Sequence, residues 1–165
     1  MNKLFVGIDN GTSGAIGIVS DDSSLHCWYS TPSKIELSYT KTKQNISRID
    51  FPKLLILFKE KVLSYNIPVR VFLERPLVNP GQFKTTMSAM RSLEATLIVL
   101  EELKIPFSYL DSKEWQKDML PSGLKGKELK EASRQIGRRL FPDLDFGKSD
   151  CDAILIAEYA RKNKL

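Results

Sequence analysis

The 165-residue sequence is poor in the residues that bind zinc or carry redox chemistry. Its two cysteines, Cys27 and Cys151, lie far apart and form no C-x-x-C pair, and His26 is the sole histidine. The cysteine pattern therefore indicates neither a zinc site nor a redox motif, and we expect two reduced thiols. The lone histidine is interpreted as structural and not as a substrate contact.

Long hydrophobic runs are missing as well. The longest, at residues 54–58 and 153–157, are far shorter than the ~20 residues of a membrane-spanning helix. The first residues lead directly into a strand-like pattern and lack the apolar core and cleavage site of a secretory signal. We expect no transmembrane segment and an intracellular protein, in the cytoplasm or an organelle. The length and the lack of linkers or repeats predict one domain over residues 1–165.

Basic residues outnumber acidic ones in the chain, and they are unevenly distributed along it. A net charge of +5 favours polyanionic partners, and the excess is concentrated between Ser112 and Phe141, which contains eight basic and four acidic residues. A solvated helix face with Glu/Lys pairs is the alternative explanation for this segment. Charge alone does not decide between the two.

Hydrophobic patterning predicts five strands and five helices. The strands are expected at residues 3–8, 15–20, 25–30, 69–73 and 107–110, and the helices at 51–65, 82–104, 113–119, 127–140 and 150–162. Residues 34–48 show no periodicity and are expected to form a loop. This mixed α/β order predicts an RNase H-like fold, with a five-stranded mixed sheet whose first three strands are antiparallel, flanked by helices.

Acidic residues stand at the ends of the predicted elements. Asp9 ends the first strand within Gly-Ile-Asp-Asn-Gly, Glu74 directly follows the apolar run 69–73, and Asp150 and Asp152 begin the last helix. Taken singly, each is more often a turn or helix-cap residue than a ligand. In the predicted fold, however, the first and fourth strands are neighbours and the last helix packs across them. The acids would then converge at one edge of the sheet.

Converging carboxylates repel one another unless cations neutralise them, and Mg²⁺ prefers oxygen ligands. Two such ions, about 3.5–4 Å apart, can activate a water and stabilise the leaving oxygen during attack on a phosphodiester. The pattern therefore predicts a metal-dependent phosphodiesterase that needs no histidine or serine nucleophile.

The motifs together resemble the RuvC-type Holliday-junction resolvases, particularly their phage and chloroplast branches. The resemblance spans nearly the whole chain and rests on five segments, which are Gly-Ile-Asp-x-Gly at Asp9, the strand-end Glu74, Trp115 to Pro121, the helix from Lys127 through Ser133 to Pro142, and Asp152 to Tyr159. It implies a homodimer that nicks two symmetric strands of a four-way DNA junction, as in DNA recombination and repair. It also implies two Mg²⁺ ions, replaceable by Mn²⁺, held by Asp9, Glu74 and Asp152. Residues 82–104 would contribute to the dimer contact.

The fourth metal ligand departs from the family pattern. Relatives carry an acid three or four positions before the one that matches Asp152, where this chain has Lys148 and Ser149. Asp150 is only two positions away. Because residues two apart do not share a helix face, Asp150 can substitute only from a nonhelical lead-in.

Basic side chains are the expected DNA contacts, and each neutralised phosphate would steepen the salt dependence of binding. The candidates are Arg75, Lys84, Lys125, Lys127, Lys130, Arg134, Arg138 and Lys148. For Lys148 an ordinary surface role is favoured over contact with the scissile phosphate. Phe83 is a candidate for stacking on an unpaired base, although core packing at the start of its helix is the favoured interpretation.

Two other functions fit parts of the sequence. The segment from Gly7 to Gly14 is also similar to the first phosphate-binding turn of the actin and sugar-kinase ATPases, although those proteins contain two RNase H-like halves and this chain has room for one. A noncatalytic module that binds branched DNA is the second alternative, in which the changed fourth acid marks lost activity.

Overall fold

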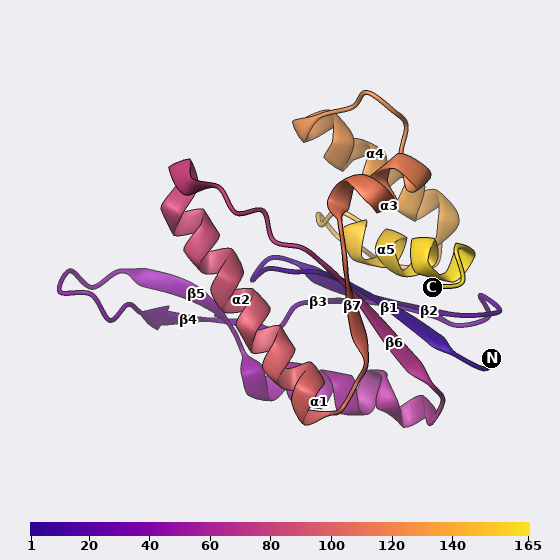
Figure 1. The fold of residues 1–165 in the computed structure, drawn as a ribbon, viewed down its shortest axis with the longest axis horizontal. Helices are drawn as coiled ribbons and strands as arrows, with labels where there is room; N and C mark the ends of the chain where they lie inside the picture. The colour runs from indigo at the N-terminus through magenta and orange to yellow at the C-terminus, as the bar shows by residue number, and fades with distance from the viewer.

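The fold is built on a twisted five-stranded sheet in a computed structural model that describes all residues 1–165 (Figure 1). The strand order is β3-β2-β1-β6-β7. Its members are β1 (Leu4–Asp9), β2 (Ala15–Ser20), β3 (His26–Ser30), β6 (Val69–Glu74) and β7 (Phe107–Leu110). The first three strands are antiparallel, and β1, β6 and β7 are parallel neighbours. The predicted RNase H-like sheet is confirmed.

Helices cover both faces of this sheet. On one face lie α1 (Phe51–Lys61), followed by a 3₁₀ turn (Leu63–Tyr65), and α2 (Phe83–Glu102), preceded by a 3₁₀ turn (Pro80–Gln82). On the other lie α3 (Ser112–Met119), α4 (Gly126–Leu140) and α5 (Asp152–Lys162). None of these helices combines the length and apolarity needed to cross a bilayer.

Alternation along β1 divides the core into two layers. Leu4, Val6 and Ile8 belong to the hydrophobic cluster under α1 and α2, whereas Phe5 belongs to the cluster under α3 and α5. The central strand is buried along Leu4–Ile8 and becomes partly accessible only at Asp9. The carboxylate of Asp9 is therefore attached to a rigid support.

Close packing places the start of α5 across the centre of the sheet. Gly7 and Gly17 are cross-strand partners in β1 and β2. A Cβ at Gly7 would lie 2.2 Å from the carbonyl oxygen of Ala153, and one at Gly17 would lie 2.4 Å from the Cα of Ile154. Only glycine permits the helix to approach this closely. This contact brings the first turn of α5 toward the end of β1.

The prediction of a loop at residues 34–48 was wrong. The segment contains β4 (Ser33–Leu37) and β5 (Asn45–Ile49), which pair as a separate antiparallel hairpin that projects from the body of the molecule (Figure 1). Glu36 binds Lys34 and Arg48 through ion pairs of 2.7 and 2.6 Å. Most of the hairpin is exposed, so it lacks the buried face that produces a recognisable hydrophobic alternation.

The side chains interpreted as structural have structural surroundings. His26 contacts Asp143 at 2.7 Å and its ring packs against Phe141, far along the chain from its own strand. Both cysteines are free thiols. Cys151 is buried against Gly137 of α4 and thereby joins α4 to the segment that precedes α5.

Candidate active site

Three separate segments bring the predicted acids together. Ile8 of β1 pairs with Leu73 of the parallel strand β6. The next residues, Asp9 and Glu74, therefore lie side by side at the carboxyl ends of these two strands. Asp152 is the first residue of α5, which packs on β1. Asp150 precedes that helix, and α5 begins two residues later than expected. Asp150 therefore lies in a nonhelical lead-in to α5. This is the position from which it could act as the fourth metal ligand.

The electrostatics of Asp9 indicate a crowded acidic site. Burial is the largest cause that raises its pKa to about 7, and repulsion from Glu74, Asp150 and Asp152 raises it further. Lys130 acts in the opposite direction. No protein group donates a hydrogen bond to the Asp9 carboxylate, so the alternative of a turn-capping role has no support. No ion pair contacts this carboxylate directly, and Lys130 compensates its charge only in part.

Glu74 and Asp152 share this environment. Burial raises the pKa of Glu74 to about 7, opposed by a hydrogen bond from Trp115, while Asp152 and Asp150 add repulsion. Burial and then repulsion from Asp150 raise the pKa of Asp152 to about 6, opposed by a hydrogen bond from Ser133. Three partly buried carboxylates whose charges repel one another form a site that a cation would stabilise.

The donor set fits a hard divalent cation. All four candidate ligands are carboxylates, and neither Asp150 nor Asp152 forms a side-chain cap on α5. With the side chains as they stand, no group of three or more His, Cys, Asp and Glu residues has the spacing of a finished metal site. Asp150 is instead paired with Lys130 at 3.4 Å. Side-chain rotation toward a cation would replace mutual repulsion with coordination.

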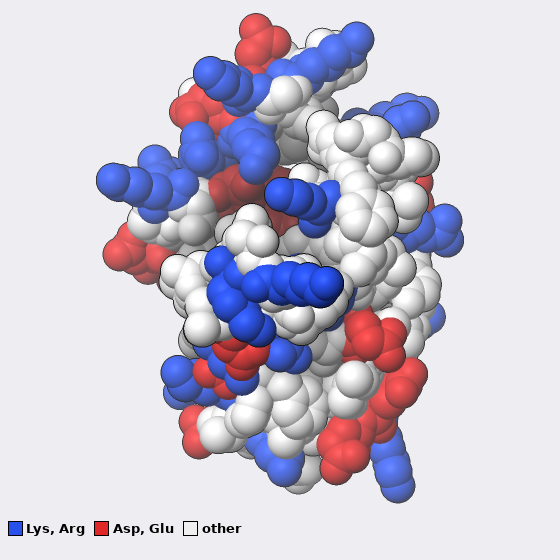
Figure 2. Space-filling view, turned by 90° about the vertical axis from the view of Figure 1, so that its left-hand side faces the viewer, with Lys and Arg blue, Asp and Glu red and all other residues white.

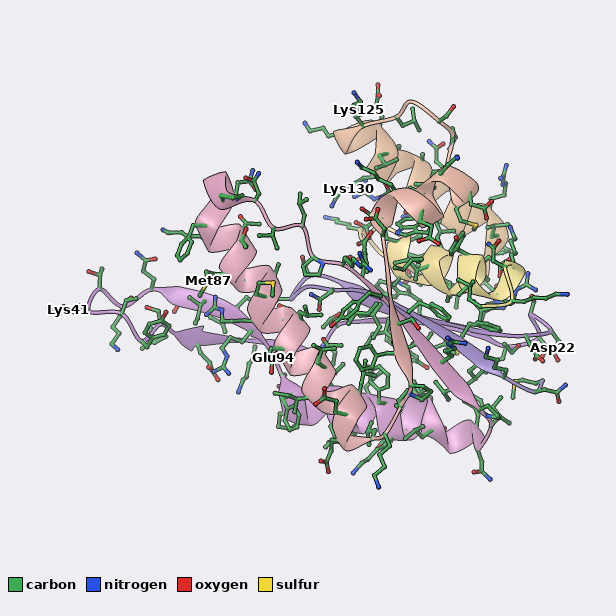
Figure 3. All side chains as sticks on the ribbon, in the orientation of Figure 1. Asp22, Lys41, Met87, Glu94, Lys125 and Lys130 are labelled. Carbon is green, nitrogen blue, oxygen red and sulfur yellow. The ribbon has the colours of Figure 1, made fainter.

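Basic residues border this acidic site. Figure 2 shows acidic atoms recessed between projecting Lys and Arg side chains. In Figure 3, Lys125, which directly precedes α4, and Lys130, within α4, lie on the side of this helix toward α2. The predicted DNA contacts Arg75, Lys84, Lys125, Lys127 and Lys148 are exposed and free of ion pairs.

The remaining predicted contacts on α4 already have protein partners. Lys130 is bound to Asp150, Arg134 is 3.4 Å from Glu131, and Arg138 donates a 2.8 Å hydrogen bond to the carbonyl of Gly147. The favoured interpretation of Phe83 was wrong, because its side chain is 70% exposed at the start of α2 and packs in no core.

Besides the ion pair of Lys130 with Asp150, two hydrogen bonds from neutral donors to the acids were not predicted. The indole of Trp115 in α3 donates to Glu74 at 3.0 Å, and the hydroxyl of Ser133 in α4 donates to Asp152. Both residues lie in segments that carry the family resemblance, but residue type and spacing alone do not indicate which side chain a buried donor will meet. The tertiary structure supplies that information.

Comparison with known proteins extends the fold assignment. No protein-family model and no curated protein matches the sequence. Among solved structures, Thermus thermophilus RuvC in complex with a Holliday junction substrate matches with a TM-score of 0.62 and 13% identity, over 99% of this chain and 96% of that one. A second Thermus thermophilus RuvC structure matches with a TM-score of 0.59 and 12% identity, over 98% and 96%. These likenesses establish that the chain has the RNase H-like fold of RuvC.

Proposed function

We propose that this protein is a divalent-metal-dependent endonuclease that resolves four-way DNA junctions by paired phosphodiester hydrolysis. The observation that carries the proposal is the convergence of Asp9, Glu74, Asp150 and Asp152 from β1, β6 and the start of α5. The matching RuvC structure was solved with a Holliday junction, which supports a junction as the substrate. A recessed, partly buried acidic site bordered by basic side chains suits a reaction on a phosphate backbone.

Each group has a distinct task in this reaction. Asp9, Glu74 and Asp152 would hold Mg²⁺ or Mn²⁺, with Asp150 as the fourth ligand, and two bound ions would supply an activated water and stabilise the leaving oxygen. The rigid ends of β1 and β6 fix the two ligands that they carry. Lysine and arginine side chains around the site bind the phosphates on either side of the cut.

The DNA contacts proposed for α4 can be tested by salt dependence. Lys127→Ala is expected to weaken junction binding and to reduce the slope of log K against log salt concentration by about 0.9 for each copy of the chain bound, because one phosphate contact is lost. Lys59→Ala, in α1 on the opposite side of the sheet, serves as the matched control. The contact is ruled out if both variants give the wild-type slope in a fluorescence-anisotropy titration.

Phe83 is proposed to stack on a base at the branch point. Its ring is exposed at the start of α2, after the loop that leaves the active-site end of β6, and Lys84 beside it is exposed as well. An aromatic ring next to a cation suits an unpaired base and its phosphate.

A homodimer is proposed through α2. Met87, Met90 and Ile98 are 38%, 42% and 45% exposed along one side of this helix. Figure 3 places Met87 and Glu94 on α2 beside the β4–β5 hairpin. A groove of about 770 Å³ lies between this helix and the hairpin, lined partly by Ala95 and Ile98. A two-fold dimer matches a substrate with two equivalent strands.

Charge placed on this surface should separate the two copies. Met90→Glu is expected to convert the protein to a monomer in sedimentation velocity, because an interface core excludes unpaired charge. Ile56→Glu is the control, since Ile56 is a similarly exposed apolar residue on α1. A wild-type protein that is monomeric at tens of micromolar would contradict the proposed dimer.

A single nuclease assay tests the central proposal. Wild-type protein is incubated with a synthetic four-way junction or a linear duplex of the same sequence, with and without Mg²⁺. We expect symmetric nicks in the junction only, and only with metal. Junction binding without cleavage would favour the noncatalytic module, and ATP binding without DNA cleavage would favour the actin-like alternative. Equal digestion of both DNAs would indicate a general nuclease.

A further inference from the structure

Two buried side chains contact the acidic site from its protein side. Trp115 in α3 is fully buried, and its indole Nε1–H donates to Oε1 of Glu74 at 3.0 Å. Ser133 in α4 is 1% exposed, and its hydroxyl donates to Oδ1 of Asp152. Neither residue can touch DNA, and the proposed chemistry does not use them. Both side chains nevertheless donate hydrogen bonds to two of the carboxylates.

We propose that Trp115 and Ser133 are positioning residues that orient Glu74 and Asp152 for cation binding. The inference rests on the proposed function, since it concerns the same site, but it assigns roles to residues outside the ligand set. A ligand that is fixed by a neighbouring hydrogen bond loses less rotational freedom on coordination. Partners of this kind typically contribute about 10–100-fold to metal affinity or activity.

Trp115 is suited to this task by its rigidity and by its single donor. The indole packs in the cluster that contains Phe72, Leu110 and Ile154, so the N–H direction is fixed by the core. The bond engages one oxygen of Glu74, and no protein donor reaches the other oxygen. A neutral donor also leaves the carboxylate charge intact for a cation, whereas a lysine at this position would compete with the metal.

Ser133 is constrained from two sides. Its oxygen accepts the backbone N–H of Cys151 at 3.3 Å, which directs the hydroxyl proton toward Asp152. Gly137, one turn further along α4, packs directly against the side chain of Cys151, where a Cβ would lie 2.2 Å from the cysteine Cβ. The serine is thus fixed relative to the start of α5.

The same face of α4 also contacts Asp150, the fourth acid. Lys130, three residues before Ser133, pairs with Asp150 at 3.4 Å. One helix therefore contacts both acids at the start of α5, one through a neutral donor and one through a cation. Side-chain contacts therefore join α4, which carries the proposed phosphate contacts, to two of the proposed metal ligands.

Conservative substitutions with matched controls test the proposal. Trp115→Phe removes the donor and preserves an aromatic ring, and Ser133→Ala removes only the hydroxyl. The controls are Trp28→Phe, because the buried indole N–H of Trp28 has no partner, and Ser92→Ala, because Ser92 is 2% exposed in α2 and contacts none of the four acids. Each control makes the same chemical change away from the site.

The principal measurement is Mn²⁺ affinity in the DNA-free protein by calorimetry. We expect affinity about 10–100-fold weaker for Trp115→Phe and for Ser133→Ala, and within about twofold of wild type for both controls. The Mg²⁺ concentration for half-maximal nicking should rise in parallel, with much of the rate recovered at saturating metal. Thermal unfolding of each variant separates packing loss from positioning. A lowered Tm with unchanged Mn²⁺ affinity overturns the proposal.

A spectroscopic measurement examines the hydrogen bond itself. In Trp28→Phe the only indole is that of Trp115, whose N–H gives one side-chain signal in a ¹H–¹⁵N NMR spectrum. This signal should move when Mg²⁺ is added and when Glu74 is replaced in Glu74→Gln. A signal that responds to neither change contradicts the role of Trp115.

The outcomes distinguish this inference from the proposed function. A wild-type protein that binds Mn²⁺ but cuts no junction rejects the nuclease assignment, while the affinity ratios still decide whether Trp115 and Ser133 position the ligands. A wild-type protein that binds no divalent cation overturns both proposals.

Discussion

Asp9→Asn is expected to reduce the rate of Mg²⁺-dependent junction cleavage by about 10³-fold or more, which corresponds to about 4 kcal/mol of lost transition-state stabilisation. Asp9 is the carboxylate at the centre of the site, since Glu74, Asp150 and Asp152 all repel its charge. An amide in its place offers one neutral oxygen and loses the anionic ligand that a hard cation prefers. The expected defect lies in chemistry and metal binding, not in recognition of the junction.

Binding and cleavage must therefore be measured separately for this variant. Junction affinity in Ca²⁺ or without metal should be equal to or tighter than that of wild type, because removing an anion from a site bordered by cations reduces repulsion of the phosphates. Asp118→Asn, an exposed aspartate in α3, is the control and should retain full activity. Cleavage by Asp9→Asn at a rate near that of wild type would eliminate the carboxylate mechanism.

Much of this site was predictable because its elements have strong local signals. The continuous apolar run before Glu74 indicates a buried strand, and the glycines beside Asp9 indicate a close approach, so the topology of the fold brings these acids together. The start of α5 was placed two residues early. The correction matters, because it puts Asp150 outside the helix and makes it available as a ligand.

What escaped prediction depends on exposure or on tertiary contact. The β4–β5 hairpin has an exposed surface in which Ile35 and Leu37 are 74% and 67% accessible, so no buried face marked it as strand. Phe83 was expected in the core, but the loop that precedes it leaves the ring in solvent. The bonds from Trp115 and Ser133 join residues 41 and 19 positions apart, a relation that no local pattern encodes.

The ion pair of Lys130 with Asp150 would couple the proposed DNA binding to the fourth acid. The ammonium group of Lys130 lies 3.4 Å from Asp150, and its charge lowers the pKa of Asp9 and of Asp152, against the repulsion between the acids. A phosphate that binds Lys130 would release Asp150 toward the other carboxylates. The acidic cluster would then repel itself more strongly and gain more from a cation. Substrate and metal binding are therefore expected to reinforce each other.

The acidic cluster should also make the metal-free protein less stable as the pH rises, and Asp9→Asn should remove part of this cost. Below about pH 3, Asp9 is mostly neutral in the folded and the unfolded chain, so its titration has little effect on folding. Between pH 4 and about 7, the unfolded chain loses this proton near the ordinary pKa of 3.8, while the folded chain retains it up to about 7. The unfolded state thus gains free energy of ionisation first, and stability is lost across that window.

At pH 8 in EDTA, Asp9→Asn should therefore be more stable than wild type by about 2–4 kcal/mol, which corresponds to a Tm about 5–15 °C higher. At pH 4 the two proteins should unfold at nearly the same temperature, because a neutral carboxyl and an amide are similar in size and polarity. Added Mg²⁺ should raise the Tm of wild type at pH 8 but have little effect on the variant, since a cation that binds the folded state stabilises it by mass action. Differential scanning calorimetry at both pH values measures all of these effects. If Asp9→Asn were destabilised equally at pH 4 and pH 8, the carboxylate would have no electrostatic cost in the folded protein, and a cation would have no repulsion to relieve.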